Sequence, residues 1–96
     1  MPTPEEVDAV GTIEIDFGGR LATVSRWKSP TFDGRAIAPG RWYHVLSSDG
    51  VTSYGMVNVI KGESYAYRPF EVGQGLGEVV GSLDEGLRVL RRDFGG

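Results

Sequence analysis

The chain has 96 residues, no cysteine and a formal net charge of −3, with 40% apolar and 24% charged residues. This composition is ordinary for a soluble globular protein, and the length suits one domain with one core. Without cysteine, disulfides and thiolate metal sites are excluded. No apolar run approaches the roughly 18–20 residues of a membrane span, and the first residues are acidic where a secretory signal is basic. We therefore expect a cytoplasmic protein without a membrane partner.

Charge is distributed unevenly along the chain. Residues 1–16 carry five acids and no base, whereas residues 17–70 carry seven bases and three acids. Two prolines and three acids within residues 1–10 predict a flexible lead-in, and residues 11–96 are then a single α+β domain.

A first hairpin is predicted between residues 12 and 27. Apolar and polar residues alternate from Thr12 to Phe17, which is typical of a strand with one buried face. Gly18-Gly19 then forms a two-residue turn. In the resulting register Ile15 lies opposite Ala22, so the apolar residues of both strands share a face.

Two segments have the composition of loops. Lys28 to Gly40 contains three dipeptides typical of turns, and structureless segments of this length are uncommon and often functional. Residues 71–81 contain four glycines, with Val79-Val80 as a short edge strand.

A three-stranded meander is predicted from about Arg41 to Phe70, with turns at Asp49-Gly50 and Lys61-Gly62. Two-residue turns would place Tyr43 opposite Met56, and Met56 opposite Tyr67. All four tyrosines then share one face of the sheet: Tyr43, Tyr54, Tyr65 and Tyr67. The opposite face collects Trp42, His44, Leu46, Val57, Val59 and Ala66.

The last element predicted is a helix over residues 82–94. Ser82 is an N-cap with Glu85 three residues later. An apolar stripe follows at helical spacing: Leu83, Leu87, Leu90 and Phe94. The fold class is therefore α+β, with an antiparallel sheet of five to six strands that can curl towards a small barrel. One C-terminal helix packs on a face of this sheet.

The tyrosine face suggests binding, because tyrosine offers rigid apolar area with a polar tip. We expect a small non-catalytic interaction module or regulator that binds a protein or forms a homodimer, unless the first hairpin covers this face as core. The alternative is single-stranded nucleic-acid binding by the basic and aromatic segment 20–68. The candidate binding residues for both functions are Tyr43, Tyr54, Tyr65, Tyr67, Trp27, Arg41 and Arg68.

His44 is the only histidine, and Gly55 is expected opposite it with Arg68 beyond. His44 and Arg68 could then line a small notch for an anion, or His44 could simply be bonded to backbone. No serine or cysteine lies in a recognised nucleophile motif, so we expect no catalytic residue, no enzyme activity and no cofactor. Asp33 and Asp49 each precede glycine, which is typical of turns, and no metal site is predicted.

Overall fold

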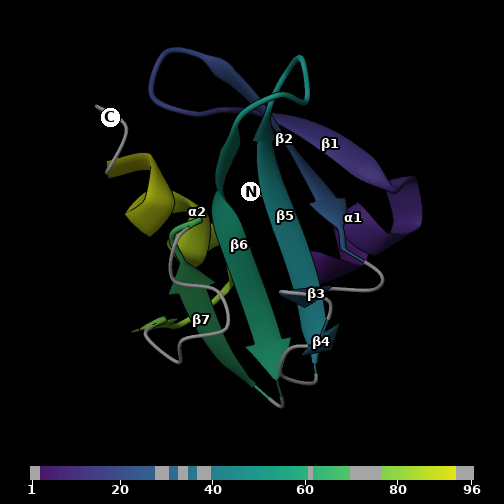
Figure 1. Cartoon of the computed structure of the whole chain (residues 1–96), viewed down its shortest axis with the longest axis vertical. Helices are drawn as coiled ribbons and strands as arrows, with labels where there is room; N and C mark the ends of the chain where they lie inside the picture. Colours follow the sequence, from purple (N-terminus) through teal and green to yellow (C-terminus); the bar gives the residue numbers. More distant parts are fainter. Residues whose placement is uncertain are drawn as a thin grey trace.

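The structure is a computed structural model that describes residues 3–27, 31–32, 35–36, 40–60, 62–69 and 77–92. Its main feature is a six-stranded antiparallel sheet of order β1-β2-β5-β6-β7-β8 (Figure 1). The strands of this sheet are β1 (Thr12–Asp16), β2 (Leu21–Arg26), β5 (Arg41–Ser47), β6 (Ser53–Ile60), β7 (Glu63–Tyr67) and β8 (Glu78–Val80). Within the described ranges the sheet does not close into a barrel, and β1 and β8 are its edges.

Helices α1 (Pro4–Val10) and α2 (Leu83–Arg92) both lie behind the sheet in Figure 1. They share one apolar core with the strands, which contains Val7 from α1 and Leu90 from α2, both 0% exposed. This confirms the predicted α+β class with a C-terminal helix on one face. Neither helix is long and apolar enough to span a membrane, as far as the described residues go.

The segment predicted as a loop from Lys28 to Gly40 contains a separate two-stranded ladder. It consists of β3 (Thr31–Phe32) and β4 (Arg35–Ala36), with Thr31 paired to Ala36. Most other residues of this segment lie outside the described ranges, as do residues 71–76 of the predicted glycine-rich loop.

Helix α1 lies where a flexible lead-in was predicted. Thr3 caps the helix by accepting a hydrogen bond from the Glu6 N–H at 3.2 Å, and Pro4 occupies the first turn. A helix of seven residues is unstable by itself, so tertiary contacts must hold it. Val7 supplies an apolar contact. The sequence did not predict this helix, because a single valine forms no periodic apolar pattern.

The first hairpin has the predicted register. Ile13 pairs with Val24 and Ile15 with Ala22, and Phe17 donates its N–H to the Arg20 carbonyl at 2.7 Å. Gly18 and Gly19 both have positive φ, as a two-residue turn matched to strand twist requires.

The β5–β6 hairpin departs from the predicted register at a β-bulge. Next to the turn, Leu46 pairs with Ser53 as predicted, but Val45 then pairs with Gly55. Tyr54 is thus an extra residue without a partner on β5, and every pair beyond it moves by one position. Tyr43 consequently lies opposite Val57 rather than Met56, and His44 lies opposite Met56.

The β6–β7 hairpin keeps its predicted register, with Met56 opposite Tyr67 and Asn58 opposite Tyr65. Because a shift of one residue exchanges the two faces of a strand, Tyr43 lies under the helices while Tyr65 and Tyr67 lie on the other side. The predicted face of four tyrosines is therefore wrong.

Gly55 makes the bulge compatible with α2. Its φ is +134°, and a Cβ added there would lie 2.6 Å from the Tyr67 carbonyl oxygen and 2.8 Å from Leu90 Cδ2. The backbone of β6 thus approaches the helix more closely than any residue with a side chain permits. Gly86 of α2 is its counterpart, because a Cβ there would lie 2.9 Å from Val57 Cγ2.

Helix α2 begins as predicted. The Ser82 hydroxyl accepts a hydrogen bond from the Glu85 N–H at 3.1 Å, and Leu83, Leu87 and Leu90 are buried. The Glu85 carboxylate also accepts a hydrogen bond at 2.8 Å from the N–H of Gly81, the residue before the N-cap. Phe94, the last residue of the predicted stripe, lies outside the described residues.

Replacing Gly55 should test the bulge directly. Gly55→Ala combines a strained backbone with a steric clash, and we expect it to lower the free energy of unfolding by about 3 kcal/mol or more. Gly19→Ala is the matched control, because φ there is +89° but nothing lies within 4 Å of an added Cβ. The control should lose about 1–2 kcal/mol. Equal losses in urea denaturation would contradict the close approach of β6 to α2.

Candidate functional site

The structure separates the predicted tyrosines into two environments. Tyr43 is 0% exposed and Tyr54 is 5% exposed, and both belong to the core beneath the helices. Tyr54 stacks on Phe17 with ring centroids 4.8 Å apart. Tyr65 and Tyr67 lie on the opposite face and remain partly exposed. Only these two of the four tyrosines can therefore contact a partner without unfolding.

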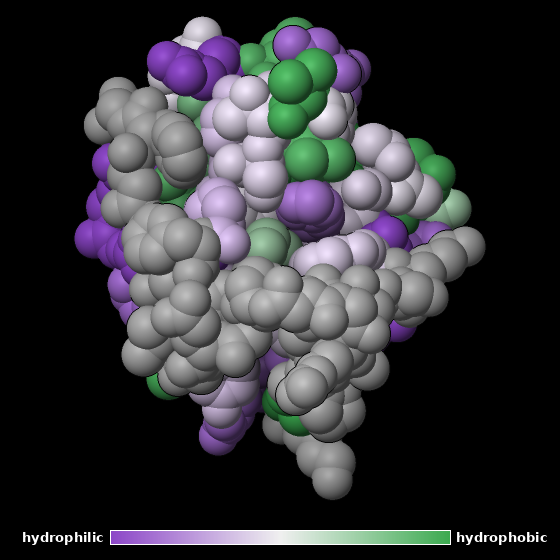
Figure 2. Space-filling view, in the orientation of Figure 1, coloured by the Kyte–Doolittle hydropathy of each residue, from purple (hydrophilic) through white to green (hydrophobic). Residues whose placement is uncertain are grey.

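A cluster of rings forms instead on the face of the sheet that neither helix covers. We call it the aromatic face, and it consists of Trp27, Trp42, His44, Met56, Tyr65 and Tyr67. Trp42 and Met56 are buried at its centre, with 2% and 5% of their surface exposed. Trp27 and Tyr67 pack against this pair and stay partly exposed. Figure 2 views the molecule from this side, where apolar, weakly polar and strongly hydrophilic patches adjoin in the upper part of the described surface.

Ring contacts hold the aromatic face rigid. Trp27 meets Trp42 edge to face at 6.3 Å and stacks on His44 at 5.2 Å, and Trp42 lies 5.2 Å from Tyr67. Such pairs contribute about 0.5–1.5 kcal/mol each beyond the area they bury. Gly77 lies against the ring of Tyr67, where an added Cβ would be 2.6 Å from Cζ. The rings of Trp27, Trp42 and Tyr67 are thus each packed against at least one neighbour on this face.

His44 has a polar partner that the sequence did not indicate. Its Nε2 lies 2.9 Å from the Ser53 hydroxyl, and burial lowers the pKa of the imidazole below its usual 6.5. A neutral imidazole within hydrogen-bond distance of a hydroxyl resembles the base and the nucleophile of a catalytic pair. In the part of the chain that the structure describes, no carboxylate is bonded to the other ring nitrogen.

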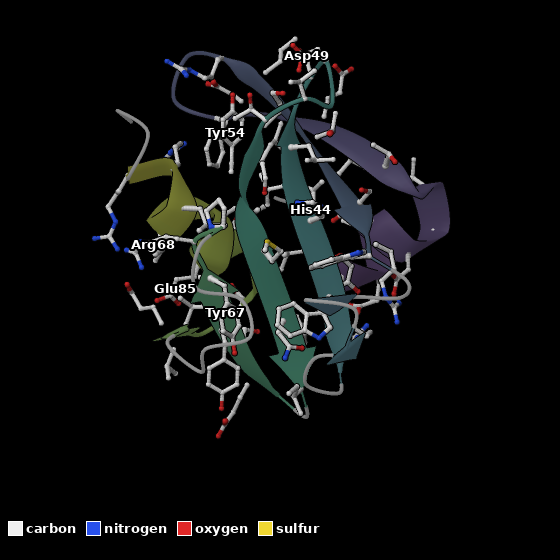
Figure 3. All side chains as sticks on the ribbon, in the orientation of Figure 1. His44, Asp49, Tyr54, Tyr67, Arg68 and Glu85 are labelled. Atoms are coloured by element: carbon white, nitrogen blue, oxygen red, sulfur yellow. The ribbon has the colours of Figure 1, made fainter. Side chains whose placement is uncertain are left out.

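The arrangement predicted for the anion notch, with Gly55 between His44 and Arg68, is not found in the structure. Gly55 lies opposite Val45, so it does not lie between His44 and Arg68. Figure 3 shows His44 over β5 and Arg68 on the other side of β6. The guanidinium of Arg68 is 3.7 Å from the carboxylate of Glu78.

Three arginines of the middle segment, Arg26, Arg41 and Arg68, are paired with acids from elsewhere in the chain. Asp8 of α1 accepts hydrogen bonds from Arg26 at 3.2 Å and from the Tyr43 hydroxyl at 3.1 Å. Arg41 lies 3.3 Å from the Glu5 carboxylate and 3.7 Å from that of Asp8. Burial and the hydrogen bond to Asp8 raise the pKa of Tyr43, so its hydroxyl stays a donor. This network attaches α1 to β2 and β5, and it places Arg41 away from the aromatic face.

A cleft opens on the helix side, between β1 and α2. Its volume is about 520 Å³. The apolar residues along it are Ile15, Phe17 and Leu87, and the charged ones are Asp16, Asp84, Arg88 and Arg91. The sequence prediction missed this cleft because its two walls lie about 70 positions apart in the chain. Among the described residues, no three His, Asp or Glu side chains are placed to hold a metal ion.

Two serine substitutions should separate core from surface tyrosines. Tyr54→Ser removes a buried ring stacked on Phe17 and should lower the free energy of unfolding by about 3–5 kcal/mol. Tyr65→Ser removes a partly exposed ring whose hydroxyl bonds Glu63, and should cost less than about 1 kcal/mol. Thermal and urea unfolding would measure both, and similar losses would contradict the observed bulge.

The pKa of His44 predicts a pH dependence of stability. Because burial lowers its folded pKa, the unfolded chain binds the proton more tightly. The free energy of unfolding should therefore be highest above about pH 6.5 and fall as the pH drops from there through the folded pKa. His44→Gln should remove this fall between pH 7 and pH 5.5. Since the chain has one histidine, NMR titration of its ring can locate the folded pKa, and an unshifted value would refute the prediction.

The geometry thus offers two surfaces, the aromatic face and the cleft between β1 and α2. Their chemistry differs, since the first is made of rings and the second has an apolar floor with charges around it. No family model matches the chain, and neither a curated protein nor a solved structure matches it.

Proposed function

We propose that the protein is a non-catalytic binding module that contacts a protein partner, or a second copy of itself, through the aromatic face. The observation behind this proposal is the layered packing of that face. Partly exposed Trp27 and Tyr67 rest on buried Trp42 and Met56. Rings braced in this way lose little conformational freedom on binding, and such aromatic anchors carry most of the energy of protein interfaces.

The polar groups beside the rings suit a protein surface. Tyr65 and Tyr67 present hydroxyls at the ends of partly exposed rings, and His44 with Ser53 lies at the margin. The core of an interface is typically poor in charge and rich in aromatic residues and methionine, with polar groups around it. The aromatic face has this composition.

Single-stranded nucleic-acid binding remains the alternative, and the ion pairs weigh against it. Stacking on rings needs cations beside them to neutralise phosphates. Arg26 and Arg41 instead pair with Glu5 and Asp8 beneath the sheet, and Arg68 lies beside Glu78. Salt-sensitive binding of a single-stranded oligonucleotide, weakened by Trp27→Ala, would favour this alternative over the protein-binding proposal.

Trp27→Ala and Tyr65→Ser should test the proposal. Sedimentation velocity over a range of concentrations would detect self-association, and affinity capture from native extract would detect a partner. We expect either variant to weaken the association by about tenfold or more, because truncating an aromatic anchor typically removes 2 kcal/mol or more.

Val51→Ala is the matched control for these variants. Val51 is 81% exposed in the turn between β5 and β6 and lies outside the aromatic face. The Val51→Ala variant should self-associate, or capture the partner, as strongly as the unmodified protein. Two results together would disprove the proposal. The protein would remain a monomer at all concentrations, and Trp27→Ala and Tyr65→Ser would capture the same proteins as the unmodified chain.

A further inference from the structure

β1 has an open hydrogen-bonding edge. In the described residues it pairs with β2 alone. The bond from the Phe17 N–H to the Arg20 carbonyl marks a hydrogen-bonded pair at the turn. Because such pairs alternate along an antiparallel ladder, Ile15 is bonded to β2, whereas Glu14 and Asp16 direct their N–H and C=O groups away from it.

This edge borders the cleft described above. Ile15 and Phe17 from the β1 side and Leu87 from α2 form its apolar part. The volume of about 520 Å³ is within the roughly 300–1,000 Å³ typical of ligand sites. An edge strand beside a helix, with an apolar floor between them, suits an extended peptide. Main-chain hydrogen bonds to the edge supply affinity, and alternate side chains enter the pocket.

The charges around the cleft indicate what the peptide should carry. Arg88 is paired with Asp84 at 3.0 Å, and Asp16 accepts the Gly19 N–H at 2.9 Å. Arg91 lies exposed on the α2 wall and, within the described ranges, forms no ion pair. Arginine binds carboxylates well because its planar group can form two parallel hydrogen bonds with them. A carboxylate near Arg91 would therefore complement the one uncommitted cation of the described cleft wall.

We propose that the cleft between β1 and α2 binds an extended segment of a partner protein as an added strand on β1. Its apolar side chains lie over partly exposed Ile15, with buried Phe17 and Leu87 beneath, and its carboxylate meets Arg91. The carboxylate comes from an acidic side chain or from the end of the partner chain. This surface is separate from the aromatic face, so the inference goes beyond the proposed function and does not depend on it.

The probe for this site is a displayed library of random hexapeptides, with selected sequences synthesised and labelled for fluorescence anisotropy. Selected peptides should combine alternating apolar residues with one carboxylate. Each is made with a free and with an amidated C-terminus: loss of binding on amidation assigns the carboxylate to the chain end, and retention assigns it to a side chain. Binding should also protect the amides of Glu14 and Asp16 from hydrogen exchange.

Two pairs of variants isolate the two contacts. Glu14→Pro removes an outward N–H of the edge without removing a bond to β2, and Glu14→Gln keeps that N–H. Arg91→Ala removes the uncommitted cation, and Arg92→Ala makes the same change on α2 outside the cleft lining. The first member of each pair should weaken binding about tenfold or more. The second member should stay within about threefold of the unmodified protein.

Four results would overturn the inference. They are a library that enriches no peptide, selected peptides that bind Glu14→Pro and Arg91→Ala as tightly as the unmodified protein, unchanged exchange at Glu14 and Asp16, and a dimer of this chain that Glu14→Pro dissociates. The last result would assign the edge to a second copy instead of a partner segment.

Discussion

The close contact between β6 and α2 at Gly55 is the constraint on which the arrangement of side chains depends. Gly55 is where the backbone meets Leu90, and the bulge at Tyr54 lies directly before it. The bulge moves Tyr43 and Val45 to the helix side of β5 and Trp42 and His44 to the other side. Without it the helix-side core would receive tryptophan and histidine, and the aromatic face would not form. A local irregularity of one residue thus decides the chemistry of both faces.

The ion pairs of α1 neutralise two arginines of the basic middle segment, Arg26 and Arg41. The acids of the first residues fold back onto the arginines of β2 and β5, with Asp8 in contact with both Arg26 and Arg41. Charges that are 18 to 36 positions apart in sequence therefore cancel in space. This pairing lowers the positive charge that Arg26 and Arg41 present to a polyanion at long range.

Local patterns predicted the strands of the main sheet and helix α2, but not helix α1, the β3–β4 ladder or the faces of the central hairpin. The β1–β2 register follows from matched alternation around Gly18-Gly19, and α2 follows from its cap and leucine stripe. No local pattern indicates the bulge. Glycine at position 55 is required by its contact with Leu90 of α2, and this contact is known only from the tertiary structure. The sequence predicted one binding surface for all four tyrosines with Trp27 and Arg41. In the structure Trp27, Tyr65 and Tyr67 lie partly exposed on the aromatic face, whereas Tyr43 and Tyr54 are buried on the helix side. The cleft needed the tertiary structure, since nothing local links β1 to α2.

The attachment of α1 also sets an order of events during folding. The strands of the main sheet pair largely with their sequence neighbours, which favours rapid assembly of hairpins. Helix α1 precedes its partners Arg41 and Tyr43 by more than 30 residues in the chain. Seven residues cannot persist as a helix without them. The α1 segment therefore gains its stabilising contacts to Arg41 and Tyr43 only after β5 has joined the sheet.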